Sequence, residues 1–189
     1  MRIISGKYKG RRISPPKNLP VRPTTDMSKE ALFNVLNNHF DFAGLKVLDL
    51  FSGTGNISYE FASRGSDNIM SVDADFGCVK FIKQTAAEFD FNIAAIKSDV
   101  MAFIQKSNAT FDIIFADPPY ALEQAAFEKI VLAIFANNLL KNEGMMVIEH
   151  SKYTKLDHME NFSFKKSYGG SIFSFYEFAS AESTEETES

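Results

Sequence analysis

Residues 47 to 56 read V-L-D-L-F-S-G-T-G-N, an apolar run that contains an acid and ends in two closely spaced glycines. The run predicts a buried strand over 46–50, and the glycines predict a tight turn that lets the backbone approach a ligand. A helix is expected from Asn56, and its N-terminus would supply free N–H groups at that turn. A strand, a turn and a helix in this order are the repeating unit of an α/β fold.

The same alternation continues along the chain. Further strands are expected at 69–73, 93–97, 111–116 and 145–149, and helices at 27–40, 56–64, 76–89, 101–106 and 123–137. Two β-rich runs, 162–166 and 172–178, meet near Gly169 and Gly170 and predict a final antiparallel hairpin. The fold class is therefore α/β: a Rossmann-like, mostly parallel seven-stranded sheet with an antiparallel C-terminal hairpin and a small N-terminal β extension.

Charge divides the chain into three parts. Residues 1–30 hold eight Lys and Arg against two acids, although the whole chain carries a net charge of -4. We expect a basic β-hairpin arm and loop over 1–25, the main domain over 26–179, and a disordered acidic tail over 180–189. A basic arm of this kind suits contact with phosphate, and a solvated strand pair is the simpler alternative.

Composition excludes several classes of protein. The single cysteine, Cys78, rules out a disulfide framework and a Cys-rich metal site, and no metal is expected. The basic N-terminus lacks the apolar core of a secretory signal, and no apolar run has transmembrane length. A cytoplasmic monomer without membrane contact is the resulting expectation.

Acids stand at the ends of the first three expected strands: Asp49, Asp73 and Asp99. An acid inside the glycine loop disfavours a pyrophosphate and favours an ammonium group; a dinucleotide loop would also carry a third glycine. Asp73 is placed to accept ribose hydroxyls, and Asp99 to accept an adenine amino group while Val100 packs on the ring. Each of the two could instead cap a helix, with Asp75 competing for the first cap. Together the acids describe a ligand with an amine, a ribose and an adenine, as in S-adenosylmethionine.

The fourth strand ends in D-P-P-Y, residues 117 to 120. Its two prolines stop the strand and impose a rigid corner. Asp117 and the carbonyl of Pro118 could each accept an N–H from an exocyclic amino group, and Tyr120 could stack on the base that carries it. A strand-ending turn without a catalytic role is the alternative.

These motifs, in this order, resemble class I S-adenosylmethionine-dependent methyltransferases that act on an amino nitrogen. R-I-I-S-G-K-Y-K-G-R-R-I at 2–13 and R-P-T-T-D-M-S-K-E-A-L-F-N-V-L at 22–36 resemble the RsmD family of 16S rRNA guanine-N2 methyltransferases. The resemblance spans residues 2 to about 178. It implies methylation of one guanine N2 in 16S rRNA, within a 30S subunit or a late assembly particle.

The resemblance also implies roles for individual residues. The cofactor would contact the loop after the first strand and the ends of the next three: Asp49, Phe51, Ser52, Gly53, Thr54, Gly55, Asp73, Ala74, Asp99, Val100 and Asp117. Asp117, Pro118 and Tyr120 would form the catalytic set. The RNA substrate would contact Lys7, Tyr8, Lys9, Arg11 and Arg12 of the arm, with Arg22, Thr24 and Thr25 in support.

Three other functions fit parts of the sequence. A DNA adenine-N6 methyltransferase also uses D-P-P-Y, but the chain has no insertion large enough for a DNA target-recognition domain. A non-catalytic RNA-binding assembly factor could keep the fold, although the intact Asp117 and glycine loop argue against it. An NAD-linked oxidoreductase is disfavoured because the glycine loop lacks the full fingerprint.

Overall fold

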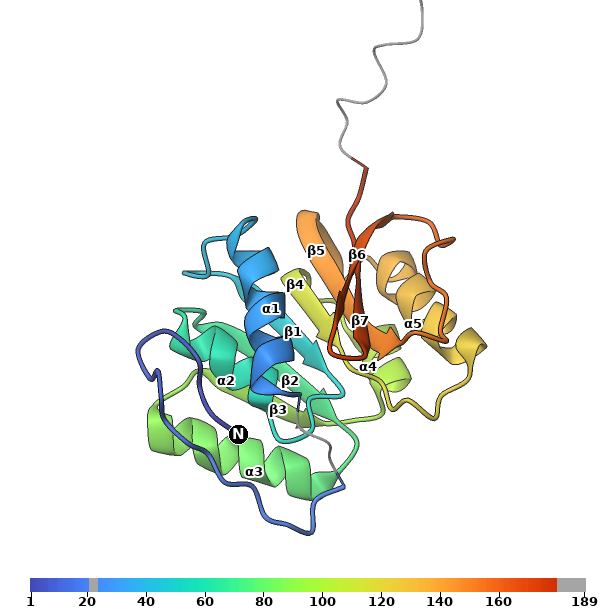
Figure 1. Cartoon of the computed structure of the whole chain (residues 1–189). Helices are drawn as coiled ribbons and strands as arrows, with labels where there is room; N and C mark the ends of the chain where they lie inside the picture. The colour runs from blue at the N-terminus through green and yellow to red at the C-terminus, as the bar shows by residue number, and fades with distance from the viewer. Residues whose placement is uncertain (21–23, 180–189) are drawn as a thin grey trace, which may run out of the picture.

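The computed structural model describes residues 1–20 and 24–179 and is built on one seven-stranded sheet (Figure 1). The strand order is β3-β2-β1-β4-β5-β7-β6. The first five strands run parallel, and β7 pairs antiparallel with both β5 and β6. The strands are β1 (Lys46–Leu50), β2 (Asn68–Asp73), β3 (Ile93–Lys97), β4 (Phe111–Ala116), β5 (Leu140–Ser151), β6 (Phe162–Tyr168) and β7 (Ser171–Tyr176).

Helices cover both faces of this sheet. They are α1 (Asp26–Asn37), α2 (Asn56–Ser63), α3 (Phe76–Phe89), α4 (Val100–Lys106) and α5 (Gln124–Ala136). Buried side chains of α1, α2 and α3 pack on one face, and those of α4 and α5 pack on the other. The central strands are therefore buried on both sides, which explains their nearly continuous apolar sequence. The predicted α/β fold class is confirmed.

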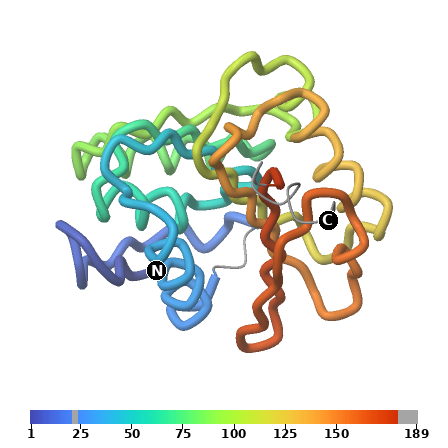
Figure 2. Tube along the Cα trace, turned by 90° about the horizontal axis from the view of Figure 1, so that it is seen from above, coloured from blue at the N-terminus to red at the C-terminus, as the bar shows by residue number. Residues whose placement is uncertain are grey.

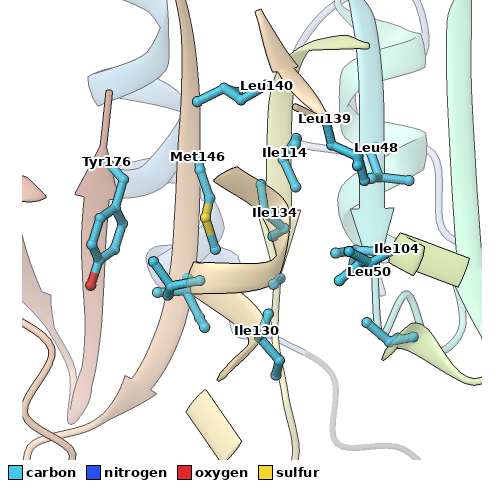
Figure 3. Close-up of a cluster of buried hydrophobic side chains, with 14 of the residues drawn as sticks. Leu48, Leu50, Ile104, Ile114, Ile130, Ile134, Leu139, Leu140, Met146 and Tyr176 are labelled. Carbon is cyan, nitrogen blue, oxygen red and sulfur yellow. The ribbon is translucent and has the colours of Figure 1, made fainter. Parts of the chain in front are cut away.

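Figure 3 shows the core between the sheet and the α4–α5 layer. Leu48 and Leu50 of β1 and Ile114 of β4 contribute from the sheet, and Ile134 contributes from α5; all four are fully buried. Each such side chain contributes about 1.5–3 kcal/mol through burial of its apolar surface. This core holds the strand ends rigidly in register.

Most predicted elements keep their predicted bounds, and β5 is the main exception. The strand expected at 145–149 extends from Leu140 to Ser151, because Leu140 pairs with Phe111 before a register shift in the β4–β5 ladder. The predicted C-terminal hairpin is present and turns at Gly169 and Gly170, both with positive φ. Figure 2 shows this hairpin beside α1, and a Cβ at Gly169 would stand 3.5 Å from the Met27 methyl at the start of that helix.

The N-terminal segment pairs over a shorter stretch than the two strands expected over 2–13: the amide of Ile3 donates to the Arg11 carbonyl at 2.9 Å, and that of Ile13 to the Met1 carbonyl at 3.0 Å. Its only β pairing among the described residues is one isolated antiparallel bridge between Arg2 and Arg12. Beyond this pair the backbone is bound by α2: both carboxylate oxygens of Glu60 accept amides, from Ile4 at 2.9 Å and Ser5 at 3.0 Å. Residues 1–20 thus form a strap: the expected hairpin is present as a short pair, and its next residues dock on α2 because the buried Glu60 carboxylate takes their N–H groups.

The strap continues along α3 towards the carboxyl ends of the parallel strands (Figure 1). Leu19 lies against Gly77 at the start of α3, where a Cβ would stand 2.7 Å from the leucine methyl. From there the chain passes to Thr24 and Thr25 at the start of α1. The strap therefore runs from the amino ends of the parallel strands to their carboxyl ends.

Candidate active site

The carboxyl ends of β1 to β5 meet at one edge of the sheet, beside a cavity of about 610 Å³. The volume is that of a small-molecule site, and the location is where open α/β sheets bind ligands. Loops after β1, β2, β3 and β4 line the cavity together with the end of β5 and the start of α1. The predicted cofactor and catalytic segments, which are far apart in the sequence, are thus brought together.

The described part of the cavity lining is acidic. It contains five strand-end carboxylates and an N-cap acid but no Lys or Arg: Asp49, Asp73, Asp75, Asp99, Asp117 and Glu149. Such a surface attracts a cationic ligand and repels phosphate. The absence of a third glycine from the loop after β1 agrees with this.

Asp49 is the most deeply buried of these acids, with 1% of its surface exposed. Its carboxylate accepts a 2.5 Å hydrogen bond from the Ser58 hydroxyl, which also lies 2.6 Å from the Ser71 hydroxyl. Burial raises the pKa of Asp49 to about 7, although the Ser58 hydrogen bond opposes the shift. A bound ammonium group would stabilise the ionised form.

The loop after β1 turns through three residues with positive φ: Phe51, Gly53 and Gly55. The amide of Gly53 donates to the Asp73 carboxylate at 2.7 Å, which fixes the loop against β2. The Ser52 hydroxyl is buried at the cavity and has no hydrogen-bond partner among the described residues. An unsatisfied buried hydroxyl facing a cavity is the mark of a group that bonds to a ligand.

The two helix-cap alternatives resolve differently. Asp75, not Asp73, caps α3 by accepting from the Cys78 amide at 2.8 Å. Asp73 keeps its place in the cavity lining, where it accepts from the amides of Gly53 and Asp75. Asp99 does both: it caps α4 through the Ala102 amide at 2.9 Å and also lines the cavity.

The D-P-P-Y corner faces the same cavity. The Asp117 amide donates to the carbonyl of Leu50 at 3.3 Å, which ties the corner to the end of β1. The Tyr120 hydroxyl reaches β5 and β7, at 3.2 Å from the Glu149 carboxylate and 2.7 Å from the Ser171 hydroxyl. Burial raises the pKa of Tyr120, so its hydroxyl stays protonated and can donate. The ring is 44% exposed and can still meet a base.

Sequence reasoning missed Glu149, Asn56 and Ser171, which also line the cavity. Glu149 follows the same rule as the other acids, since it lies near the carboxyl end of a parallel strand, and that rule could have found it. Asn56 donates to the carbonyl of Thr24 at 3.1 Å and accepts from the Lys29 ammonium at 2.9 Å. No local pattern indicates these long-range contacts.

The predicted RNA-binding residues fall into two groups. Thr24 and Thr25 line the cavity, and Thr25 also caps α1 through the Ser28 amide at 3.1 Å. Arg22 lies outside the described residues. The basic residues of the strap are exposed and are not among those that line the cavity: Lys7, Lys9, Arg11 and Arg12.

The Tyr8 side chain contacts the end of α3 and the loop that follows it. Its hydroxyl donates to the carbonyl of Phe89 at 2.8 Å, and its ring packs edge-on against Phe89 and Phe91. These contacts hold the strap on the end of α3. The ring therefore has a packing role near the amino ends of the parallel strands, away from the cavity.

S-adenosylmethionine fits these residues. Asp49 offers a buried acceptor for an ammonium group, Ser52 a hydroxyl that no described residue bonds, and Asp73 a carboxylate at the end of β2. Its net positive charge matches the acidic lining. No group of three His, Cys, Asp or Glu with metal-binding geometry occurs within 1–20 and 24–179, and no helix there could span a membrane.

Comparison with known proteins gives the family. Residues 1–177 match the model of the family described as Conserved hypothetical protein 95. Ribosomal RNA small subunit methyltransferase D of Buchnera aphidicola subsp. Baizongia pistaciae is 31% identical over 150 residues, which cover 79% of this chain and 75% of that protein. The chain belongs to this family, the RsmD family.

Solved structures agree with the fold of the RsmD family member described here. A hypothetical protein of Thermus thermophilus superposes with a TM-score of 0.80 at 26% identity, over 94% of this chain and 99% of that chain. The 16S rRNA N2 G1207 methyltransferase RsmC of the same species, with AdoMet and guanosine bound, superposes with a TM-score of 0.66 at 20% identity. That match covers 85% of this chain and 45% of RsmC. The fold is that of class I methyltransferases.

Proposed function

We propose that this protein transfers a methyl group from S-adenosylmethionine to the exocyclic N2 of one guanine in 16S rRNA, within a 30S subunit or late assembly particle. Membership of the RsmD family supports the methyltransferase activity and the rRNA substrate. One observation supports this chemistry: the D-P-P-Y corner lines the same acidic cavity as the glycine loop and the ends of β1, β2 and β3.

The residues of the cavity divide into two sets. Asp49 and Ser52 hold the amino-acid end of the cofactor, Asp73 the ribose, and Asp99 with Val100 the adenine. The cofactor supplies a methyl group on a positively charged sulfur, so no metal ligand is needed for the reaction.

D-P-P-Y prepares the amino nitrogen. An exocyclic amine on a purine is a weak nucleophile because its lone pair is delocalised into the ring. Asp117 and the Pro118 carbonyl each accept one N–H, which favours a pyramidal nitrogen and localises the lone pair. The two prolines fix the acceptors, and Tyr120 supports the base once it has left its stack.

The test is transfer of labelled methyl from S-adenosylmethionine to unmodified 30S particles, naked 16S rRNA and duplex DNA, followed by digestion to nucleosides. We expect N2-methylguanosine from the ribosomal substrates alone. N6-methyladenine from DNA would make the protein a DNA methyltransferase. Cofactor binding without transfer to any substrate would support a non-catalytic assembly factor. Either result would overturn the proposal.

A further inference from the structure

Glu149 is a buried carboxylate that the proposed reaction has not yet used. It is 5% exposed, lines the cavity and comes from β5, the strand beside β4. Ala116 of β4 pairs with Ile148 of β5, so Asp117 and Glu149 each follow a paired residue on neighbouring parallel strands. Both side chains line the same cavity.

The cavity holds the Glu149 carboxylate beside the surface proposed for the base. Its Oε1 atom accepts from the Tyr120 hydroxyl at 3.2 Å, and the same hydroxyl lies 2.7 Å from Ser171 Oγ. Three elements therefore meet at one hydrogen-bonded cluster: the D-P-P-Y corner, β5 and the start of β7. Keeping a carboxylate so deeply buried is costly, and such groups are frequent at functional sites.

A carboxylate accepts hydrogen bonds and donates none when it is ionised. The Watson–Crick edge of guanine carries donors at N1–H and at the 2-amino group, whereas adenine carries an acceptor at N1. A flipped base is read on this edge. Glu149 would attract the guanine N1–H and repel the N1 lone pair of adenine.

We propose that Glu149 is the specificity-determining residue of this site and selects guanine by accepting its N1–H next to the amine held by Asp117. The inference rests on the proposed function and deepens it, because it assigns base choice to a residue outside the D-P-P-Y motif. The competing role for Glu149 is purely to position Tyr120.

The experiment compares two nucleosides as competitors of methyl transfer to 30S particles. Guanosine and 2-aminopurine riboside share the sugar and the 2-amino group, but the second lacks N1–H and O6. For the wild-type protein we expect 2-aminopurine riboside to compete roughly 10- to 100-fold more weakly than guanosine. In Glu149→Gln the ratio should fall towards one, because the new amide can donate to the unprotonated N1.

Tyr120→Phe is the matched control, because it removes the hydroxyl bound to Glu149 and leaves the carboxylate in place. It should keep the wild-type ratio although its kcat/KM falls. A wild-type ratio in Glu149→Gln would overturn the inference, as would an equal loss of the ratio in Tyr120→Phe. Failure of the proposed function is a separate result, since it shows as absence of N2-methylguanosine with the wild-type protein.

Discussion

Asp49 shows what a single residue contributes to this site. The carboxylate is buried at the end of β1, accepts from Ser58, and has its pKa raised to about 7. An unfolded aspartate titrates near 4, so between about pH 4 and 7 the folded state holds this proton more tightly than the unfolded state. Stability therefore falls as pH rises through this window. The proposed role of the ionised carboxylate, binding the ammonium group of the cofactor, explains why the acid is kept despite this cost.

Asp49→Asn should raise the free energy of unfolding at pH 8 by on the order of 2 kcal/mol and leave it nearly unchanged near pH 4. The amide oxygen can still accept from Ser58, so the packing is preserved. Urea unfolding at the two pH values measures the difference. A gain of equal size at both pH values would mean that the buried charge is not its cause.

The same residue gives a prediction for ligand binding. Because only the ionised Asp49 attracts an ammonium group, the affinity of the wild-type protein for S-adenosylhomocysteine should increase as pH rises through about 7. Asp49→Asn should bind more weakly and lose this dependence. Calorimetric titration from pH 6 to 8 tests both points. A wild-type affinity that does not change with pH would contradict them.

Much of the site at this scale could be predicted from the sequence. Asp49, Asp73, Asp99 and Asp117 were found because parallel strands place their carboxyl ends at one edge. Glu149 ends the strand expected at 145–149 and could have been found by the same rule, but its contact with Tyr120 could not, because that contact spans 29 residues and depends on the β4–β5 ladder. The structural environment of Tyr8 was missed for the same reason, since its partners lie on distant α3 and the loop after it.

At the scale of elements, the N-terminal strap shows tertiary contacts limiting a local pattern. Glycines between short β-prone runs predict a hairpin, and its pairing is confined to residues 1–3 and 10–13 because the amides of Ile4 and Ser5 bind Glu60. Glu60 also pairs with the Lys29 ammonium at 3.1 Å and with Arg64 at 3.0 Å, and neither Glu60 nor Lys29 is more than 1% exposed. This network joins the strap, α1 and α2, and no local sequence pattern encodes it.

Gly6 and Gly10 offer a matched pair of substitutions that tests strap docking. Both have similar positive φ, 79° and 84°. A Cβ at Gly6 would lie 1.8 Å from the Ser63 carbonyl oxygen, whereas a Cβ at Gly10 would meet nothing within 4 Å. Gly10→Ala should cost about 1 kcal/mol from backbone strain alone. Gly6→Ala should lower the free energy of unfolding by clearly more than this and expose the strap to protease. Equal free energies of unfolding for the two variants would contradict the docked position of the strap.

At the scale of the whole molecule, the cavity and the tip of the basic strap lie at opposite edges of the sheet. α2 begins at the cavity with Asn56 and ends at Ser63, where it binds residues 5–8 of the strap. The length of this helix separates the two by about 10 Å. The charge asymmetry of the sequence indicated a basic arm but not its position.

Replacing Lys7 and Lys9 by Ala should weaken binding to 16S rRNA and reduce the slope of log affinity against log salt by roughly 1 to 2, because two phosphate contacts are lost. Lys106→Ala with Lys129→Ala is the control, since it removes the same charge from α4 and α5 on the other face of the sheet. Equal losses of affinity in the two double variants would mean that only the total charge matters and that the strap has no special contact with RNA.

Asp117→Ala, measured in two ways, tests the proposed roles most directly. In the proposed mechanism, Asp49, Ser52 and Asp73 bind the cofactor while Asp117 prepares the amine. Asp117→Ala should therefore bind S-adenosylhomocysteine close to normally and lose single-turnover methyl transfer to 30S particles by about 100-fold or more. Transfer at the wild-type rate, or loss of transfer that merely follows loss of cofactor binding, would contradict this division of roles in the cavity.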